Sequence, residues 1–154
     1  PSEGEEVIPD GLDALELGVQ VHKMFEKIIN LDDWKRIRKT LDSSLRFSEK
    51  DRHKIMERVQ GVMNLDSAMM FFKQGIHVEV EVDLVDQSGE VLRPDRLVRI
   101  DNVWHVIDYK SSKLGKVSHE KQVRKYVNLL SKIETYEVKG WIIYTDPTEL
   151  IFVV

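Results

Sequence analysis

The sequence contains no cysteine among its 154 residues. A chain without thiols cannot form disulfides, ligate an iron–sulfur cluster or bind zinc through thiolates. Any metal must therefore be held by oxygen and imidazole ligands, and such ligands favour hard cations such as Mg²⁺ or Mn²⁺.

The sequence also lacks the runs of apolar residues that membranes require. No stretch approaches the ~20 apolar residues of a transmembrane helix. The first ten residues, PSEGEEVIPD, have neither the basic flank nor the apolar stretch of a signal peptide. We therefore expect a cytoplasmic domain with no membrane partner.

Length and composition predict one domain. With 154 residues, of which 42% are hydrophobic, the chain is long enough for one sizeable core. We expect a flexible tail over residues 1–9 and a single domain over residues 10–154. The start at Pro1 and the apolar end LIFVV lead us to expect a piece cut from a longer polypeptide.

The net charge of −4 conceals two segments of opposite sign. Residues 1–26 carry seven acids and one lysine, whereas residues 110–125 carry six Lys or Arg residues and one acid, Glu120. A local basic stretch suggests a polyanionic partner, although a solvated helix face has the same composition.

Hydrophobic periodicity predicts a helical first half and a second half rich in strands. Helices are expected from Asp10, as the N-cap, to about residue 30, over 34–41, from the Ser48 cap to about 63, and over a short segment ending at Gly75. Strands are expected over 76–84, 91–100 and 103–109, then a helix over 118–133 and two closing strands around residues 146–147. The class is α/β or α+β, a mixed sheet flanked by helices.

Register arithmetic brings three acids together. If Asp101 and Asn102 form a two-residue hairpin loop, Asp95 falls opposite Asp108. If residues 87–89 form a three-residue loop with glycine in the left-handed position, Glu81 falls opposite Asp95. Like charges placed directly across a sheet are destabilising unless something neutralises them. A divalent cation is the simplest explanation.

Lys110 follows Asp108 by two residues, so the pleat places both on one face of the sheet. Acids that hold a metal beside a lysine suit phosphodiester hydrolysis, because the lysine can orient the nucleophile or stabilise developing charge. An ordinary surface Asp–Lys pair explains one such contact, but explains three aligned acids less well.

These residues resemble the PD-(D/E)xK nuclease superfamily. "RPDR" and, twelve residues after its aspartate, "DYK" match the bare signature, and "GVQVHKMFE", "DYKSS" and "QVRKY" together resemble the RecB-type nuclease domain over residues 15–144. The resemblance implies a restriction-endonuclease-like core and Mg²⁺- or Mn²⁺-dependent cleavage of DNA.

Carried over residue by residue, the resemblance implies a metal site and a DNA-binding surface. The metal ligands would be His22, Asp95, Asp108 and the backbone carbonyl of Tyr109, and Lys110 and Glu81 would join the two aspartates in catalysis. The DNA-binding residues would be Gln122 and Tyr126, together with the basic residues Lys113, Lys116, Lys121, Arg124 and Lys125.

Some of these assignments have rivals in the sequence. Glu79 lies two residues from Glu81 and could be confused with it, although the register favours Glu81. A lone histidine is more often a packed or surface residue than a ligand, although the motif around His22 favours ligation. Tyr126 fits a core position as well as a site position. Glu26 is better explained as a partner for a neighbouring lysine.

The leading hypothesis is therefore a metal-dependent DNA exonuclease domain that acts on single-stranded ends in bacterial recombination and repair. The resemblance implies coupling to a helicase of AddAB or RecBCD type, in the same chain or in a partner subunit. The alternative is a DNA-binding or scaffolding module with the same fold and no catalysis. Three mutually costly charges at Asp95, Asp108 and Lys110 argue against the alternative.

Overall fold

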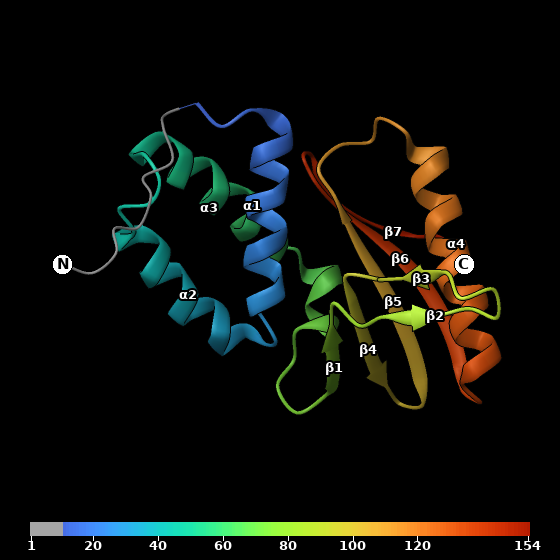
Figure 1. The fold of residues 1–154 in the computed structure, drawn as a ribbon. Coiled ribbons are helices and arrows are strands. Elements are labelled where there is room, and N and C mark those ends of the chain that lie inside the picture. Colours follow the sequence, from blue (N-terminus) through green and yellow to red (C-terminus); the bar gives the residue numbers. More distant parts are fainter. Residues whose placement is uncertain (1–10) are drawn as a thin grey trace.

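The computed structural model describes residues 11–154, and the tail expected over residues 1–9 lies outside them. The expected mixture of helices and a mixed sheet, with a helical N-terminal part, is confirmed (Figure 1). The elements in chain order are α1 (Ala14–Lys27), α2 (Leu31–Ser43), α3 (Glu49–Met63), the 3₁₀ helix η1 (Asp66–Phe71), β1 (His77–Val80), β2 (Leu84–Val85), β3 (Val91–Leu92), β4 (Arg96–Ile100), β5 (Val103–Lys110), α4 (Lys116–Ile133), β6 (Glu137–Thr145) and β7 (Thr148–Phe152).

Helices α1 and α3 begin at polar residues that satisfy their free backbone donors. The Asp13 carboxylate accepts a hydrogen bond from the Glu16 N–H, and the Glu16 carboxylate accepts one from the Asp13 N–H. Asp13 is thus the N-cap of α1, because it forms a complete capping box. The cap predicted at Asp10 is therefore wrong, and Asp10 itself lies outside the described residues. The cap predicted at Ser48 is confirmed, since its hydroxyl accepts from the Asp51 N–H.

The five-stranded sheet has the order β1-β4-β5-β6-β7. Neighbouring strands are antiparallel except for β5 and β6, which are parallel. A parallel pair needs a crossover connection, and α4 supplies it. The strand β5, which carries the "DYK" sequence, therefore lies at the centre of the sheet.

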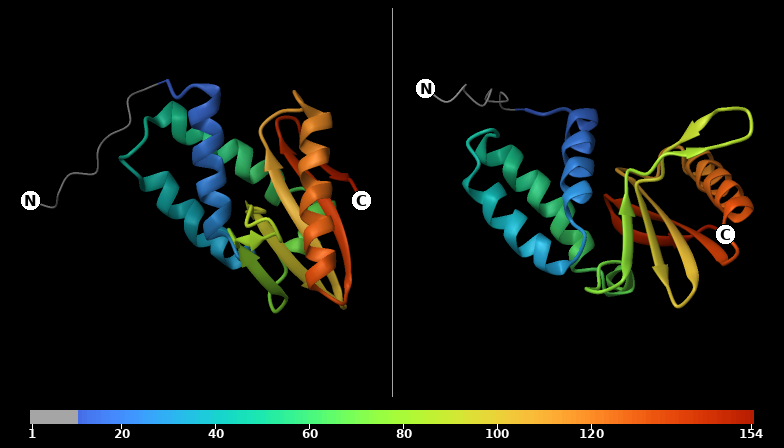
Figure 2. Two further views of the ribbon diagram at one scale, coloured as in Figure 1. Left: turned by 45° about the vertical axis from the view of Figure 1, so that its right-hand side comes forward. Right: turned by 60° about the horizontal axis from the view of Figure 1, so that its bottom comes forward.

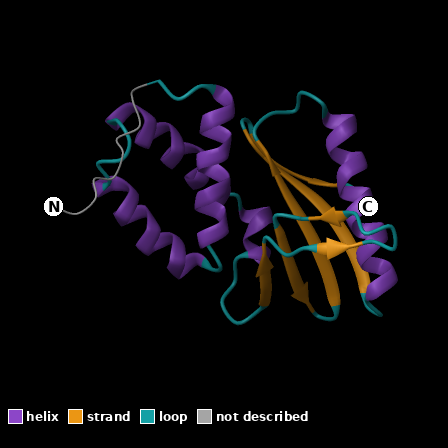
Figure 3. Ribbon diagram, viewed as in Figure 1, coloured by secondary structure: helices purple, strands orange, loops and turns teal. Residues whose placement is uncertain are grey.

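Helices cover both faces of this sheet (Figure 3). One core joins α1–α3 and η1 to residues such as Val98, Ile107 and Tyr109. The other core joins α4 to residues such as Leu97 and Val106. Adjacent residues of one strand thus enter opposite cores, as the pleat requires.

Two strands predicted to be continuous are broken, and this corrects the sequence prediction. The segment 76–84 is interrupted after Val80, where Glu81 adopts a left-handed φ of 53°. The segment 91–100 is interrupted before Arg96, where Pro94 has no N–H for a ladder. Beyond the breaks the chain forms the separate β2–β3 hairpin, which projects from the main sheet toward α4 (Figure 2).

The turn geometry agrees with the prediction. Asp101 and Asn102 have φ values of 48° and 63°, which is the left-handed pair of a two-residue hairpin loop. Gly89 has a φ of 84° in the loop between β2 and β3. These turns fix the alignment of the strands that carry the acids.

None of the helices in residues 11–154 combines the length and the apolar character that a bilayer crossing requires.

Candidate functional site

The predicted alignment of the acids is confirmed by the strand pairing. The pair Arg96↔Ile107 places Asp95, one residue earlier, opposite Asp108. The pair Val80↔Arg96 likewise places Glu81 opposite Asp95, and the Glu81 N–H donates to the Asp95 carbonyl at 3.3 Å. The hairpin loop and the break before β4 therefore bring the acids to one end of three adjacent strands.

Asp95 and Asp108 form a buried carboxyl pair. Burial and the negative charge of Asp95 raise the pKa of Asp108 to about 7. Burial acts in the same direction on Asp95, but hydrogen bonds from His22, from Asp108 and from the Tyr109 N–H (2.8 Å) hold its pKa below the usual value. The two carboxyl groups therefore titrate as a unit, and Asp108 binds a proton more readily than an ordinary carboxyl group.

Lys110 supplies a cation beside this pair. Its Nζ lies 3.0 Å from Asp108 Oδ2, on the face of the sheet that the pleat predicted. Within residues 11–154 the Lys110 ammonium is the polar group in contact with this buried oxygen. A carboxylate oxygen can accept more than one partner, so the arrangement has capacity for a further ligand.

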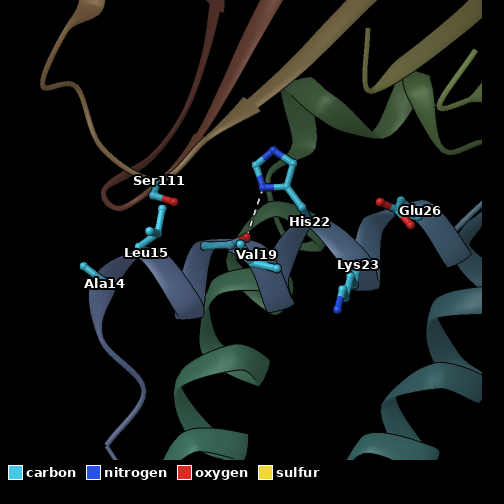
Figure 4. A pocket seen from close by; sticks show the side chains of 8 residues that line it. Ala14, Leu15, Val19, His22, Lys23, Glu26 and Ser111 are labelled. Carbon is cyan, nitrogen blue, oxygen red and sulfur yellow. Dashed lines mark hydrogen bonds between the residues drawn. The ribbon is translucent and has the colours of Figure 1, made fainter. Parts of the chain in front are cut away.

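His22 reaches the acids from α1. Its Nε2 lies 3.3 Å from Asp95 Oδ2, while Nδ1 donates to the Gly18 carbonyl at 3.0 Å. In Figure 4 the ring points from α1 toward the sheet. Burial opposes a charged imidazole, but the hydrogen bond and charge of Asp95 outweigh burial and raise the pKa of His22 to about 9. The helical half of the chain thus contributes directly to the site.

Gly18 lets α1 approach the sheet closely. A Cβ at this position would lie 2.8 Å from the Ser111 hydroxyl oxygen, in the loop that follows Lys110. A larger residue would require the Ser111 hydroxyl to turn away or α1 to shift. Gly18 therefore allows α1 to lie close to the loop that follows β5.

Glu81 lies nearer to the site than its rival Glu79. Burial, followed by the charges of Asp95 and Glu26, raises the pKa of Glu81. Glu79 instead belongs to β1 and lies 3.5 Å from His77. Because the charge of Glu26 contributes to the raised pKa of Glu81, Glu26 also lies near the site, although the sequence interpretation assigned it to a neighbouring lysine. Its spacing of four residues from His22 was the available signal.

Tyr126 is both a core residue and a part of the site. Its side chain is 5% exposed, and its hydroxyl donates to the Arg93 carbonyl at 3.5 Å. Burial, and then the charges of Asp108 and Asp95, raise its pKa, so the hydroxyl lies within the field of the acids. Gln122 lines, with Tyr126, a hollow of about 390 Å³ between α4 and the β2–β3 hairpin.

Four of the five basic residues that the resemblance assigned to DNA binding form ion pairs within residues 11–154, which composition alone did not indicate. Distant acids as well as Glu120 take part. The pairs are Lys113–Glu149, Lys116–Glu120 and Arg124–Glu120 (both 3.9 Å), and Lys125–Glu90 (2.7 Å). Lys121 makes no ion pair within the described part of the chain and is exposed. These ion pairs therefore compensate only part of the positive charge, because Glu120 serves two basic residues.

Arg96 is a positioning residue that the sequence interpretation missed. It is fully buried and donates to the carbonyl oxygens of Ile28 (2.5 Å), Ile29 (2.6 Å) and Phe71 (2.8 Å). Its guanidinium also lies 4.2 Å from the Phe72 ring centroid. Because Arg96 adjoins Asp95, these bonds tie the end of α1 to the acids. The signal was its spacing from Val98 and Ile100, because the pleat places Arg96 on the same strand face as these two apolar residues.

The donor set fits a hard divalent cation. Two carboxylates, an imidazole and the Tyr109 carbonyl belong to the ligand types that Mn²⁺ and Mg²⁺ accept. In residues 11–154 no three of the His, Asp and Glu side chains are already arranged as a metal-binding group. A bound cation would nevertheless contact the buried Asp108 oxygen beside Lys110, and it would displace the proton that the raised pKa of Asp108 favours.

No protein-family model and no curated protein sequence matches this chain. One solved structure, described as the crystal structure of SSO0001, matches with 19% sequence identity and a TM-score of 0.36. The match covers 86% of this chain and 65% of the other. A likeness this weak supports no inference about function, so the interpretation of the site depends on its geometry alone.

Proposed function

We propose that this chain is a metal-dependent nuclease domain that hydrolyses phosphodiester bonds of DNA. One observation carries the proposal, namely the buried Asp95–Asp108 pair with Lys110 on one side and His22 on the other. A cluster of two largely buried acids beside two cationic side chains costs folding free energy, because each charge must be taken out of water. Such a cost is typical of a functional site.

Each side chain has a role in this proposal. Asp95, Asp108, His22 and the Tyr109 carbonyl would hold the cation. When bound, Mg²⁺ or Mn²⁺ supplies Lewis acidity toward a phosphate oxygen and lowers the pKa of water. Lys110 is placed to stabilise charge that develops on the phosphate. The raised pKa of Glu81 suits it to accept a proton from the attacking water.

The substrate and setting are proposed from the sequence resemblance. We infer single-stranded DNA ends as the substrate, exonucleolytic cleavage, and a helicase domain or subunit as the partner that delivers the strand. Bacterial recombination and repair in the cytoplasm is the corresponding setting. The hollow beside Gln122 and Tyr126 supports a strand path next to the acids.

The test is a cleavage assay on end-labelled single- and double-stranded DNA with Mg²⁺, Mn²⁺ or a chelator. We expect cleavage that requires metal and favours single strands with free ends. A circular single strand distinguishes exonuclease from endonuclease activity. Tight DNA binding without cleavage under any metal would instead identify a binding module.

A further inference from the structure

A second hollow lies behind the loop that follows Lys110. It has a volume of about 140 Å³ and is bounded by α1, by that loop, by Arg58 of α3 and by the end of β6. Because a water molecule takes roughly 30 Å³ of liquid volume, the hollow can hold a group of several heavy atoms. None of its polar side chains is used in the proposed hydrolysis.

The polar lining is rich in hydrogen-bond donors. Ser111, Ser112 and Thr145 supply three hydroxyl groups, and Arg58 supplies a guanidinium. Thr145 is 6% exposed, which places it in the wall of the hollow and not at its rim. Hydroxyl groups beside a guanidinium match the oxygens of a tetrahedral anion.

Arg58 retains donors for such an anion. Its Nη2 contacts Asp146 Oδ2 at 2.9 Å, and within residues 11–154 it makes no other ion pair or side-chain hydrogen bond. A guanidinium has five N–H donors, so most of them are available. The Asp146 side chain is 61% exposed, so it can turn to solvent at little cost when an anion arrives.

The hollow adjoins the groove beside His22 across the close approach of Gly18 to Ser111. That groove, about 560 Å³ in volume, runs along α1 and shares Ala14, Gly18 and Ser111 with the hollow. Figure 4 shows Ser111 at one end of the groove and His22 farther along it. Ser111 also follows Lys110 directly in the chain. An anion held in the hollow would therefore lie beside the residue that follows Lys110.

We propose that this hollow is a phosphate subsite, in which Arg58, Ser111, Ser112 and Thr145 bind a phosphate group of a nucleic-acid strand neighbouring the scissile one. The inference rests on the proposed nuclease function for the identity of the strand, but the phosphate chemistry does not depend on it. The phosphate is either a terminal monoester or an internal phosphodiester.

Variants of the Arg58–Asp146 pair distinguish a phosphate-binding arginine from a structural ion pair. If the pair is only a structural ion pair, Arg58→Gln and Asp146→Asn remove the same contact and have similar effects on phosphate affinity. If Arg58 binds phosphate, Arg58→Gln weakens phosphate binding, whereas Asp146→Asn strengthens it because Asp146 competes for the same guanidinium. The two variants then change affinity in opposite directions.

The experiment measures binding without catalysis, in a chelator. The whole chain is titrated with inorganic phosphate by thermal shift, and with oligonucleotides bearing a 5′-phosphate, a 3′-phosphate or neither by fluorescence anisotropy. We expect Arg58→Gln to weaken phosphate binding about tenfold and Asp146→Asn to tighten it several-fold. Arg38→Gln, the same change at an exposed position of α2, is the control and leaves affinity unchanged.

Each outcome decides the proposal. If one terminal phosphate increases oligonucleotide affinity and Arg58→Gln abolishes that increase, the subsite binds the phosphate at that end of the strand. If Arg58→Gln lowers the affinity of all three oligonucleotides equally, the subsite binds an internal phosphodiester. The proposal is overturned if phosphate does not raise the melting temperature of the wild-type chain or of Asp146→Asn. It is also overturned if Arg58→Gln and Asp146→Asn change phosphate affinity in the same direction. Phosphate binding by a chain that cleaves no DNA would refute the nuclease while leaving the subsite intact.

Discussion

The acids beside β5 and the basic residues of α4 use charge in opposite ways. The acids are few, with Asp108 buried and Asp95 and Glu81 partly buried, and they face one another, so each shifts the pKa of its neighbours. The basic residues are many and exposed. Lys113 and Lys125 pair with carboxylates from other segments, and Lys116 and Arg124 both contact Glu120 within α4. Charge density along a sequence therefore predicts less about a site than the register that brings like charges together.

The largest effect is expected at the acid cluster, from Asp108→Asn. This change keeps the shape of the side chain but removes a metal-binding carboxylate, so cleavage should fall by more than roughly a hundredfold. In a chelator the variant should melt at or above the wild-type temperature, because it carries no buried charge. Asp42→Asn, at an exposed position, is the matched control.

Lys110→Ala should lower cleavage similarly while circular dichroism stays unchanged, because the ammonium group acts on the developing charge and contributes little to the core. Wild-type turnover in clean preparations of either variant would remove these residues from the active site. The acid cluster would then matter no more for cleavage than the basic stretch does.

A smaller change is expected from His22→Ala, which separates the metal site from the DNA-binding surface. The variant should need about 10- to 100-fold more Mn²⁺ for half-maximal activity, with DNA affinity little changed. Since only neutral imidazole binds a metal, wild-type activity should fall as the pH drops, and extra Mn²⁺ should partly restore it.

His53→Ala, at an exposed position of α3, is the control for His22→Ala. If His22→Ala has the wild-type Mn²⁺ requirement and the wild-type loss of activity at low pH, His22 is a packing residue.

The metal-free chain should lose stability as the pH rises. His22 has a folded pKa of about 9 against 6.5 when unfolded, so its contribution is complete below pH 6.5 and is lost as pH rises through 9. Asp108, with about 7 against 3.8, also binds more protons when folded, so stability falls between those values. From His22 alone the loss is on the order of 2 kcal/mol, discounted for its partly exposed ring.

Urea unfolding in a chelator at pH 6 and pH 9 measures this loss. Added Mn²⁺ should reverse the trend, because at high pH it no longer competes with protons for the same ligands. A metal-free chain that becomes more stable between pH 6 and pH 9 would contradict the assigned pKa shifts.

The sequence predicted the register of the acids because that register depends on local turn chemistry. Asp101 and Asn102 tolerate left-handed φ, and Gly89 prefers it, so counting outward from each turn aligned Asp95 with both of its neighbours. The breaks after Val80 and before Arg96 did not disturb this alignment, although no periodicity signalled them.

The features that sequence reasoning missed depend on contacts between distant segments. Glu90 lies 35 residues before Lys125, and nothing in either segment indicates their ion pair. Arg96 reaches carbonyl groups 67 and 68 residues earlier. Such contacts arise only when helices and strands pack, so composition and spacing cannot supply them.

The smallest effect is expected within the basic stretch. Lys121 makes no ion pair in the described residues, whereas Lys125 contacts Glu90 at 2.7 Å. If α4 lies against a DNA backbone, Lys121→Ala should weaken binding about threefold and lower the salt dependence by about one phosphate contact. Lys125→Ala should have less effect, because its charge is already compensated. Glu90→Gln should strengthen binding by releasing Lys125. Anisotropy titrations at several salt concentrations measure all three variants, and equal losses for the two lysines would show that ion pairing within the chain does not govern this surface.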